Sequence, residues 1–391
     1  MSLSEFFWKA LRRALHATGL VRVVLLSEKG RLTMYVERLE EHVRAKGWRA
    51  RYKWLPPWII AFDPAGTPNE SLRTYFRAFI ILVDSKEFWC ISWLVKRLAF
   101  GPAEWDRRFS RRLGRDWDEI WEKPSSLSVC RQQSIRDTVE SVHGISDFEK
   151  RLVLLSVRDS EYYAALRRSG AQVDEQPEIS GDADVRNPNV DSYLPACQML
   201  RERGYNVVRV GVNQTPLGPD WNGVARDVSR LSGSSALDLQ LASRCAFFLN
   251  GASGFWALTS LFNRPHLSLN TYSFFKGTGV SSRDIFAPQL LRRVCDGSLL
   301  SFAQMAELGT AASTKSSLQE RGLSLVKLSV TEITETVLEM IDRLSGSFEE
   351  SPSDILRRRR FEEIRVRSSG RHERGQISSL FLRRHESLLK T

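Results

Sequence analysis

The chain has 391 residues, of which 42% are hydrophobic and 26% charged, and its formal net charge is +11. This composition excludes a disordered chain, and the length fits two domains of about 150–200 residues each. No run reaches the roughly 18 apolar residues of a membrane-spanning helix. Because Arg12, Arg13 and His16 interrupt the N-terminal apolar segment, it is not typical of a secretory signal either. We therefore expect a cytoplasmic protein.

The cysteines and histidines predict neither a disulfide framework nor a zinc site. The five cysteines are far apart and form no CxxC pair, and the six histidines form no cluster. Asp116-Trp-Asp118 matches the DxD pattern that holds a metal ion in some glycosyltransferases, but it lies in a charge-rich helical run where such short matches are frequent. We expect no metal and no cofactor.

In the first half, apolar runs predict strands at residues 21–26, 58–62 and 79–83, and a helical pattern covers residues 34–47. Residues 86–150 are mostly helical in pattern and heavily charged. This half is expected to be an α/β domain of residues 1–146.

The second half alternates apolar runs with helical stretches. Strands are predicted at residues 151–157, 206–211, 245–250, 265–270 and 323–328, and helices at 192–204, 237–243, 255–263, 301–308 and 330–344. Such alternation, with short glycine-containing turns, predicts a parallel sheet covered by helices on both faces. We assign residues 147–346 to a second domain and 347–391 to a basic helical tail that packs back on the body.

Polar, basic and glycine residues follow the predicted strands of the second domain. In an open parallel sheet, ligands bind beyond the carboxyl ends of the strands. The residues at or just after those ends are Arg158, Asp159 and Tyr162; Arg209 and Gly211; Gly251, Ser253 and Gly254; and Thr271, Tyr272 and Lys276. This edge of the sheet is the predicted ligand site.

Several of these residues have two interpretations. The Gly251–Gly254 turn can receive a phosphate at a helix start, or it is a tight turn with Ser253 as N-cap. Arg158 suits bidentate contact with phosphate, or makes a surface ion pair. Arg209, within an apolar strand, binds an anion or forms a buried structural pair. Asp238 caps a helix, or accepts a hydrogen bond from a base or ribose.

Four segments carry a family resemblance: SVRDSEYY, RNPNVDSYLPACQMLRERGYNVVRVG, LDLQLASRCAFFLNGASGFWAL and SRDIFAPQLLRR. Between Val153 and Arg293 their order and spacing resemble bacterial glycosyltransferases that act on surface polysaccharides and are distantly similar to fucosyltransferases. The resemblance implies a GT-B-like fold, in which two Rossmann-like domains turn their parallel sheets toward a cleft.

The resemblance also implies residue roles. Arg158 would contact the donor pyrophosphate, Ser253 and Gly254 would lie at the donor-binding helix start, and Tyr193, Arg209 and Asp238 fall on family positions. The sequence departs from the family at Ser156, where a histidine is common, and near Lys29-Gly-Arg-Leu, where Arg-Ile-Gly-His is expected.

By this resemblance the chain is expected to transfer a sugar, without a metal, from a nucleotide-sugar donor to a surface-glycan or lipid-linked acceptor. Glu28, Asp63 and Asp159, at predicted strand ends, are candidate catalytic bases. Two alternatives stay open. One is another nucleotide-sugar enzyme, such as an epimerase, on the same scaffold. The other is a nucleic-acid or membrane-binding module, since the eleven Arg and Lys and four Glu from Ile355 to Thr391 give this segment +7. We expect no nucleic-acid partner.

Both chain ends are amphipathic. Leu3, Phe7, Leu11 and Leu15 recur at helical spacing beside basic residues, and residues 377–390 mix apolar and basic side chains. These ends either pack on the body of the protein or hold it at the anionic inner face of a membrane.

Overall fold

The computed structural model describes residues 3–17, 21–25, 58–63, 72, 76, 81–84, 94, 98, 151–158, 161, 185, 187–212, 215–229, 235–271, 279, 281–309, 314–369 and 375–390. The chain divides into two compact units. The first comprises Met1–His143, Gly233–Ser243 and Ser260–Asn263, and the second comprises Gly144–Ser232, Arg244–Thr259 and Arg264–Thr391. Among the predicted positions, Glu28, Asp116, Asp118, Asp159, Tyr162, Tyr272 and Lys276 lie outside the described residues.

The first unit contains a small parallel sheet. Its strands are β1 (Val21–Leu25), β2 (Trp58–Asp63) and β3 (Ile81–Asp84), in the order β1-β2-β3, and helix α1 (Leu3–Ala17) precedes them. All three strands fall on the predicted apolar runs. Most of helix α10 (Ser235–Arg244) also belongs to this unit, whereas the sequence assigned it to the second domain.

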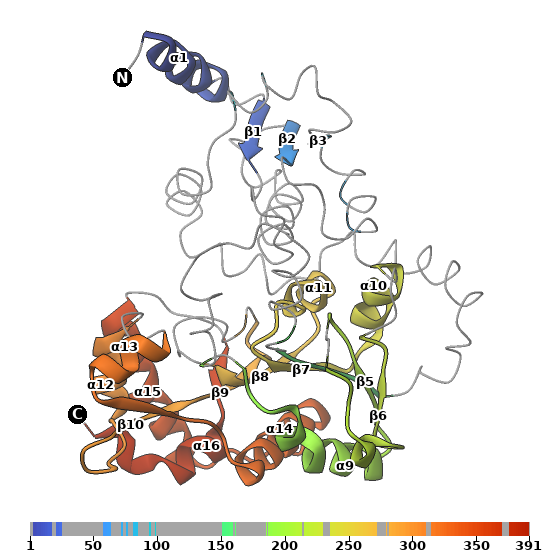
Figure 1. Cartoon of the computed structure of the whole chain (residues 1–391), viewed down its shortest axis with the longest axis vertical. Coiled ribbons are helices and arrows are strands. Elements are labelled where there is room, and N and C mark those ends of the chain that lie inside the picture. Colours follow the sequence, from blue (N-terminus) through green and yellow to red (C-terminus); the bar gives the residue numbers. More distant parts are fainter. Residues whose placement is uncertain are drawn as a thin grey trace. The chain divides into compact units, whose positions relative to one another are not determined.

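The second unit is built on a seven-stranded parallel sheet (Figure 1). The strands are β4 (Leu152–Val157), β5 (Asn206–Arg209), β6 (Ala225–Asp227), β7 (Phe247–Gly251), β8 (His266–Thr271), β9 (Ile285–Pro288) and β12 (Gln376–Ile377). Their order is β12-β9-β8-β7-β4-β5-β6. The chain therefore starts in the middle, builds outward through β5 and β6, then returns beside β4 and builds the other way. The predicted α/β class with a parallel sheet is confirmed for this unit.

The core explains why these runs become strands. Val153 and Leu155 of β4 and Phe247 of β7 are fully buried in one continuous apolar cluster, as expected of a parallel sheet covered by helices. Helices α9 (Leu194–Glu202) and α14 (Val330–Ser345) lie along one face of the sheet (Figure 1). A Ser329 capping box starts α14, and Gly346, with φ of 78°, ends it.

One predicted feature needs correction. Residues 323–326 do form a strand, β11 (Leu323–Val326), but it pairs antiparallel with β10 (Leu290–Arg293) in a separate two-stranded sheet.

The tail is part of the second unit, because β12 extends the large sheet beside β9, and helices α15 (Pro352–Ser369) and α16 (Ser379–Arg384) join its core. Helices α12 (Phe302–Leu308) and α13 (Lys315–Glu320) also contribute side chains to this core. None of the described helices is long and apolar enough to cross a bilayer.

The tail is fixed by buried carboxylates. The side chain of Glu339, fully buried, accepts hydrogen bonds from Ser378 Oγ at 2.6 Å and from the backbone amides of Ser379 and Leu380 at 3.0 and 3.1 Å. Asp354, 1% exposed, binds Arg383 at 2.6 Å, and this bond holds the pKa of the carboxyl well below its usual range. These contacts place the start of α16 against α14 and α15.

Many of the tail's positive charges are neutralised within the unit. Arg357 pairs with Asp354 and Glu386, Arg358 with Glu350, Arg365 with Glu362 and Arg384 with Glu335, at 2.7 to 3.0 Å. Arg359 and Arg360 stay exposed. Together with Arg383, five of the eleven Arg and Lys from Ile355 to Thr391 are thus bound to acidic residues among the described residues.

Candidate functional site

The candidate site lies where the strand order of the large sheet reverses. β4 and β7 are neighbours, but the chain leaves β4 toward β5 and leaves β7 toward β8. The connections therefore diverge at their carboxyl ends, and open α/β sheets have their ligand-binding crevice at such a position. Arg158 follows β4 directly and is half-buried, and its amide donates to Gly251 O at the end of β7 at 3.0 Å. The predicted residues Arg158 and Gly251 are thus brought together.

Ser156 joins three strand ends at this edge of the sheet. Its hydroxyl donates to Ser253 Oγ at 2.8 Å, which ties β4 to the turn after β7. On the other side, a Cβ added at Gly211 would lie 3.0 Å from Ser156 Oγ, and Gly211 has a φ of +92°. Only glycine takes that conformation without strain, so the end of β5 approaches closely because residue 211 has no side chain.

The turn after β7 differs from the predicted open cradle. The Ser253 amide donates to Asn250 Oδ1 at 2.8 Å, and the Phe255 amide donates to Ser253 Oγ at 3.2 Å. Ser253 is thus a capping residue, the second of its two interpretations, and two amides expected to face a phosphate are used by the chain. The helix that follows, α11 (Trp256–Leu261), has six residues, so its start alone does not make an anion site.

A buried polar row supports this turn, and the sequence analysis missed it. Ser156, Asn250 and Ser268 lie side by side in register on β4, β7 and β8, and each is at most 4% exposed. Asn250 also contacts Ser268 Oγ at 3.5 Å. In the sequence these residues stand out only as single polar positions inside apolar runs. That they lie side by side follows from the pairing of the strands, which the sequence does not show.

Tyr193 packs against the ends of β7 and β8. It is fully buried, accepts a hydrogen bond from Asn270 Nδ2 at 3.1 Å, and burial raises the pKa of its phenol. A Cβ on Gly251 would lie 3.0 Å from its hydroxyl and 3.1 Å from Val157 Cγ2. Tyr193 therefore fixes the ends of β7 and β8 and requires glycine at position 251.

At the ends of β8 and β9, two buried polar atoms make no hydrogen bond with the described residues. They are Thr271 Oγ1, at the end of β8, and Gln289 Oε1, just after β9. The other side-chain atom of Gln289, Nε2, donates to Asn270 O at 2.8 Å and to Val185 O at 3.1 Å. Because buried polar atoms are normally satisfied, these two are suited to a polar ligand or to water.

Arg209 belongs to an ion pair. Its guanidinium, 2% exposed, donates to Asp227 Oδ2 at 3.0 Å and to Thr215 O at 2.8 Å, and Asp227 also accepts from the Ser229 hydroxyl. This arrangement favours the buried structural pair over direct donor contact. Arg209 links β5 to β6 and holds the segment after Gly211.

Two acidic candidates that the structure describes, Asp238 and Asp63, lie in the first unit. Asp238, in α10, is half-buried, and burial raises the pKa of its carboxyl to about 7. Asp63 ends β2 and is in register with Asp84, which ends β3, so two acidic positions are adjacent at the carboxyl end of that sheet. The sequence analysis named Asp63 and missed Asp84. No group of three or more His, Cys, Asp or Glu side chains gathers in the described part of the chain.

A hydroxyl–imidazole–carboxylate trio in the second unit is structural. Thr259 Oγ1 and His266 Nε2 are 2.8 Å apart, and His266 Nδ1 is 3.9 Å from Asp284 Oδ2. All three residues are at most 1% exposed, and burial lowers the pKa of the imidazole. With no access for a substrate, the trio is not a hydrolytic centre.

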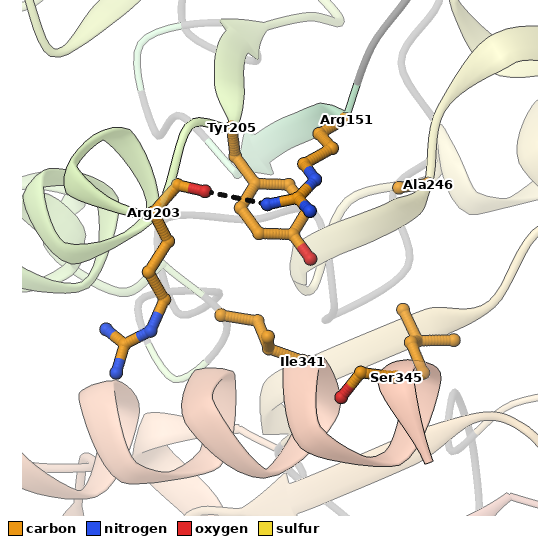
Figure 2. A pocket seen from close by; sticks show the side chains of 7 residues that line it. Arg151, Arg203, Tyr205, Ala246, Ile341 and Ser345 are labelled. Carbon is orange, nitrogen blue, oxygen red and sulfur yellow. Dashed lines mark hydrogen bonds between the residues drawn. The ribbon is translucent and has the colours of Figure 1, made fainter. Parts of the chain in front are cut away.

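A hollow of about 470 Å³ lies at the opposite, amino-terminal edge of the sheet (Figure 2). It is lined by Arg151, Arg203, Tyr205, Ala246, Ile341, Leu344 and Ser345. Arg151 donates to Arg203 O at 3.0 Å, and its guanidinium lies 5.6 Å from the centre of the Tyr205 ring (Figure 2). Arg151 thus caps the end of α9, away from the edge where ligands of such sheets bind.

Comparisons with known proteins give distant similarities. No protein-family model and no curated protein matches the chain. Among solved structures, ADP-heptose LPS heptosyltransferase II from E. coli matches 65% of this chain and 85% of its own, at 12% identity and a TM-score of 0.40. E. coli heptosyltransferase WaaC with ADP matches 69% of this chain and 91% of its own, at 10% identity and a TM-score of 0.37. Similarities this distant decide nothing about the chemistry of this chain.

Proposed function

We propose that the chain is a glycosyltransferase of GT-B type that moves a sugar, without a metal, from a nucleotide-sugar donor to a surface-glycan or lipid-linked acceptor. The second unit would hold the donor. The observation that carries this proposal is the convergence of Arg158, Gly211 and the Gly251–Gly254 turn at the strand-order reversal of a parallel sheet.

This edge of the sheet offers what a diphosphate requires. Arg158 supplies a permanent positive charge beside the last residue of β7, and Arg is suited to bidentate phosphate contact. Gly211 and Gly251, on either side of β4, let Ser156, Val157 and Tyr193 approach the strand ends closely and so fix the edge beside Arg158. The Ser253 hydroxyl is held in place by Ser156, so a phosphate would meet a preorganised partner.

In the proposed reaction, the bond between the anomeric carbon and the diphosphate oxygen breaks, and an acceptor hydroxyl oxygen bonds to that carbon. The hydroxyl proton passes to a base, and the nucleoside diphosphate leaves with the bonding electron pair. Arg158 would stabilise the charge that develops on this leaving group. Arg209 would act by positioning the segment after β5, since its own charge is paired with Asp227.

The nucleotide's base and ribose would extend from the diphosphate along the same edge. Thr271 Oγ1 and Gln289 Oε1 are suited to hydrogen bonds with them, because both are buried without a partner among the described residues. Glu28, Asp63 and Asp159 remain the candidate catalytic bases from the sequence. Asp238, which the sequence offered for the nucleotide's base or ribose, belongs to the first unit and is given no donor contact.

A thermal-denaturation screen of the full chain against UDP, GDP, CDP, CMP and ADP tests this function. A ligand at 100 times its Kd stabilises the folded state by about 2.7 kcal/mol, and one nucleotide should do so selectively. Release of free nucleoside diphosphate only when an acceptor is present would separate a transferase from an epimerase. Stabilisation by none of the five nucleotides, under conditions where the protein is folded, would refute the proposal.

A further inference from the structure

The N-terminal helix presents an unusual apolar surface. In α1, Phe6 and Phe7 are 61% and 58% exposed, and Leu11 is 39% exposed. The Phe7 ring packs edge-on against Trp8, with the ring centroids 5.5 Å apart. Scattered exposed apolar side chains are normal, but several large ones on adjacent turns of one helix indicate an interaction surface.

The charges of α1 are arranged around that surface. Leu3, Phe7 and Leu11 recur every four residues, whereas Lys9, Arg12 and Arg13 fall on other positions of the helical repeat. Glu5 is the one acidic residue among the fifteen of the helix. The helix is therefore amphipathic and basic.

We propose that α1 lies in the surface of an anionic bilayer, with Phe6, Phe7 and Leu11 inserted between lipids and the basic face that carries Lys9 at the headgroups. Exposed aromatic residues with a basic polar face are typical of such interfacial helices, and anionic lipid headgroups attract basic side chains. Charge favours this occupant over a second copy of the chain, because two basic helices of molecules with a net charge of +11 would repel one another.

The two chain ends differ in this respect. In the C-terminal tail, Phe381, Leu388 and Leu389 are buried, and Arg383 and Arg384 are bound to acidic residues. That end packs on the second unit, as one of the two alternatives for it predicts. The membrane surface therefore belongs to α1, and it is independent of the proposed transferase chemistry.

Vesicle flotation of the full chain tests the proposal. The chain should float with vesicles of phosphatidylcholine and phosphatidylglycerol in equal parts, float far less with phosphatidylcholine alone, and be released by salt. Phe6→Ser combined with Phe7→Ser should weaken binding about tenfold or more, because the apolar area of two exposed aromatic rings is lost from the lipid contact.

The matched control is Ile355→Ser with Leu356→Ser, a second adjacent exposed pair, 46% and 49% exposed, on the basic helix α15. It should leave binding unchanged, and both double variants should keep the wild-type melting temperature. The proposal fails if the wild-type chain does not float, if the α1 variant binds like wild type, or if both pairs weaken binding equally. It also fails if light scattering without lipid finds a dimer that the α1 variant abolishes.

Discussion

Replacing Gly211 with alanine should disturb the candidate site by displacing the neighbouring side chain of Ser156. Gly211 has a φ of +92°, and an added Cβ would lie 3.0 Å from Ser156 Oγ. Ser156 is in turn 2.8 Å from Ser253 Oγ, so a displaced Ser156 hydroxyl loses its bond to the turn after β7. The substitution therefore combines backbone strain with the loss of one buried hydrogen bond.

The magnitude follows from these two contributions. A left-handed backbone costs an alanine about 1–2 kcal/mol, and the lost hydrogen bond about 1 kcal/mol. Gly204→Ala is the matched control, because Gly204 has a φ of +77° and nothing within 4 Å of the added Cβ. It should show the strain alone, so the free energy of unfolding should fall by about 1 kcal/mol more in Gly211→Ala.

Two assays separate strain from site damage. Calorimetric unfolding of both variants should give the difference of about 1 kcal/mol in the free energy of unfolding. Titration with the nucleotide that stabilises the wild-type chain should show weaker binding only for Gly211→Ala. The expected loss is about fivefold, which corresponds to about 1 kcal/mol. If the two variants lose the same stability and bind nucleotide equally well, Ser156 does not connect Gly211 to the site.

Two further predictions concern buried carboxylates. Glu339→Ala should lower the free energy of unfolding by about 3–5 kcal/mol, because it leaves the buried donors of Ser378 and the α16 start unsatisfied; exposed Glu349→Ala is the control, and equal unfolding curves would contradict the role of Glu339. Burial raises the pKa of Asp238 to about 7, so the folded state holds this proton more tightly than the unfolded chain does. The free energy of unfolding of the wild type should therefore fall relative to that of Asp238→Asn as the pH rises from about 4 to 7. Above pH 7 the difference between the two proteins should stay constant. Parallel stability curves over that range would show that Asp238 is not desolvated.

The sequence predicts strands well where the sheet is most buried. β4 and β7 are central strands covered on both faces, so they appear in the sequence as nearly continuous apolar runs. β12 has two residues, and its place beside β9 depends on the docking of α15 and α16, which no local pattern encodes. β11 shows the same limit, since its apolar run predicts a strand but not the antiparallel partner β10.

Site residues at strand ends could be predicted from the sequence, whereas the contacts between side chains of different elements could not. Arg158, Gly251 and Ser253 follow apolar runs, so a parallel sheet brings them to one edge. The role of Ser253 as a cap depends on Asn250, and the neutralisation of Arg209 depends on Asp227 in the next strand. Both follow from side-chain partners that become neighbours only when the strands pair.

Nucleotide titration of two arginine variants tests the central claim most directly. Arg158 and Arg151 flank the same strand, β4, at its carboxyl and amino ends. Calorimetric titration with UDP, GDP, CDP, CMP and ADP should show that Arg158→Ala weakens the preferred nucleoside diphosphate about tenfold to a hundredfold, the effect of one charge-assisted contact, whereas Arg151→Ala binds like wild type. Wild-type affinity in Arg158→Ala, with the fold intact, or an equal loss in both variants, would contradict a donor site at the carboxyl end of β4.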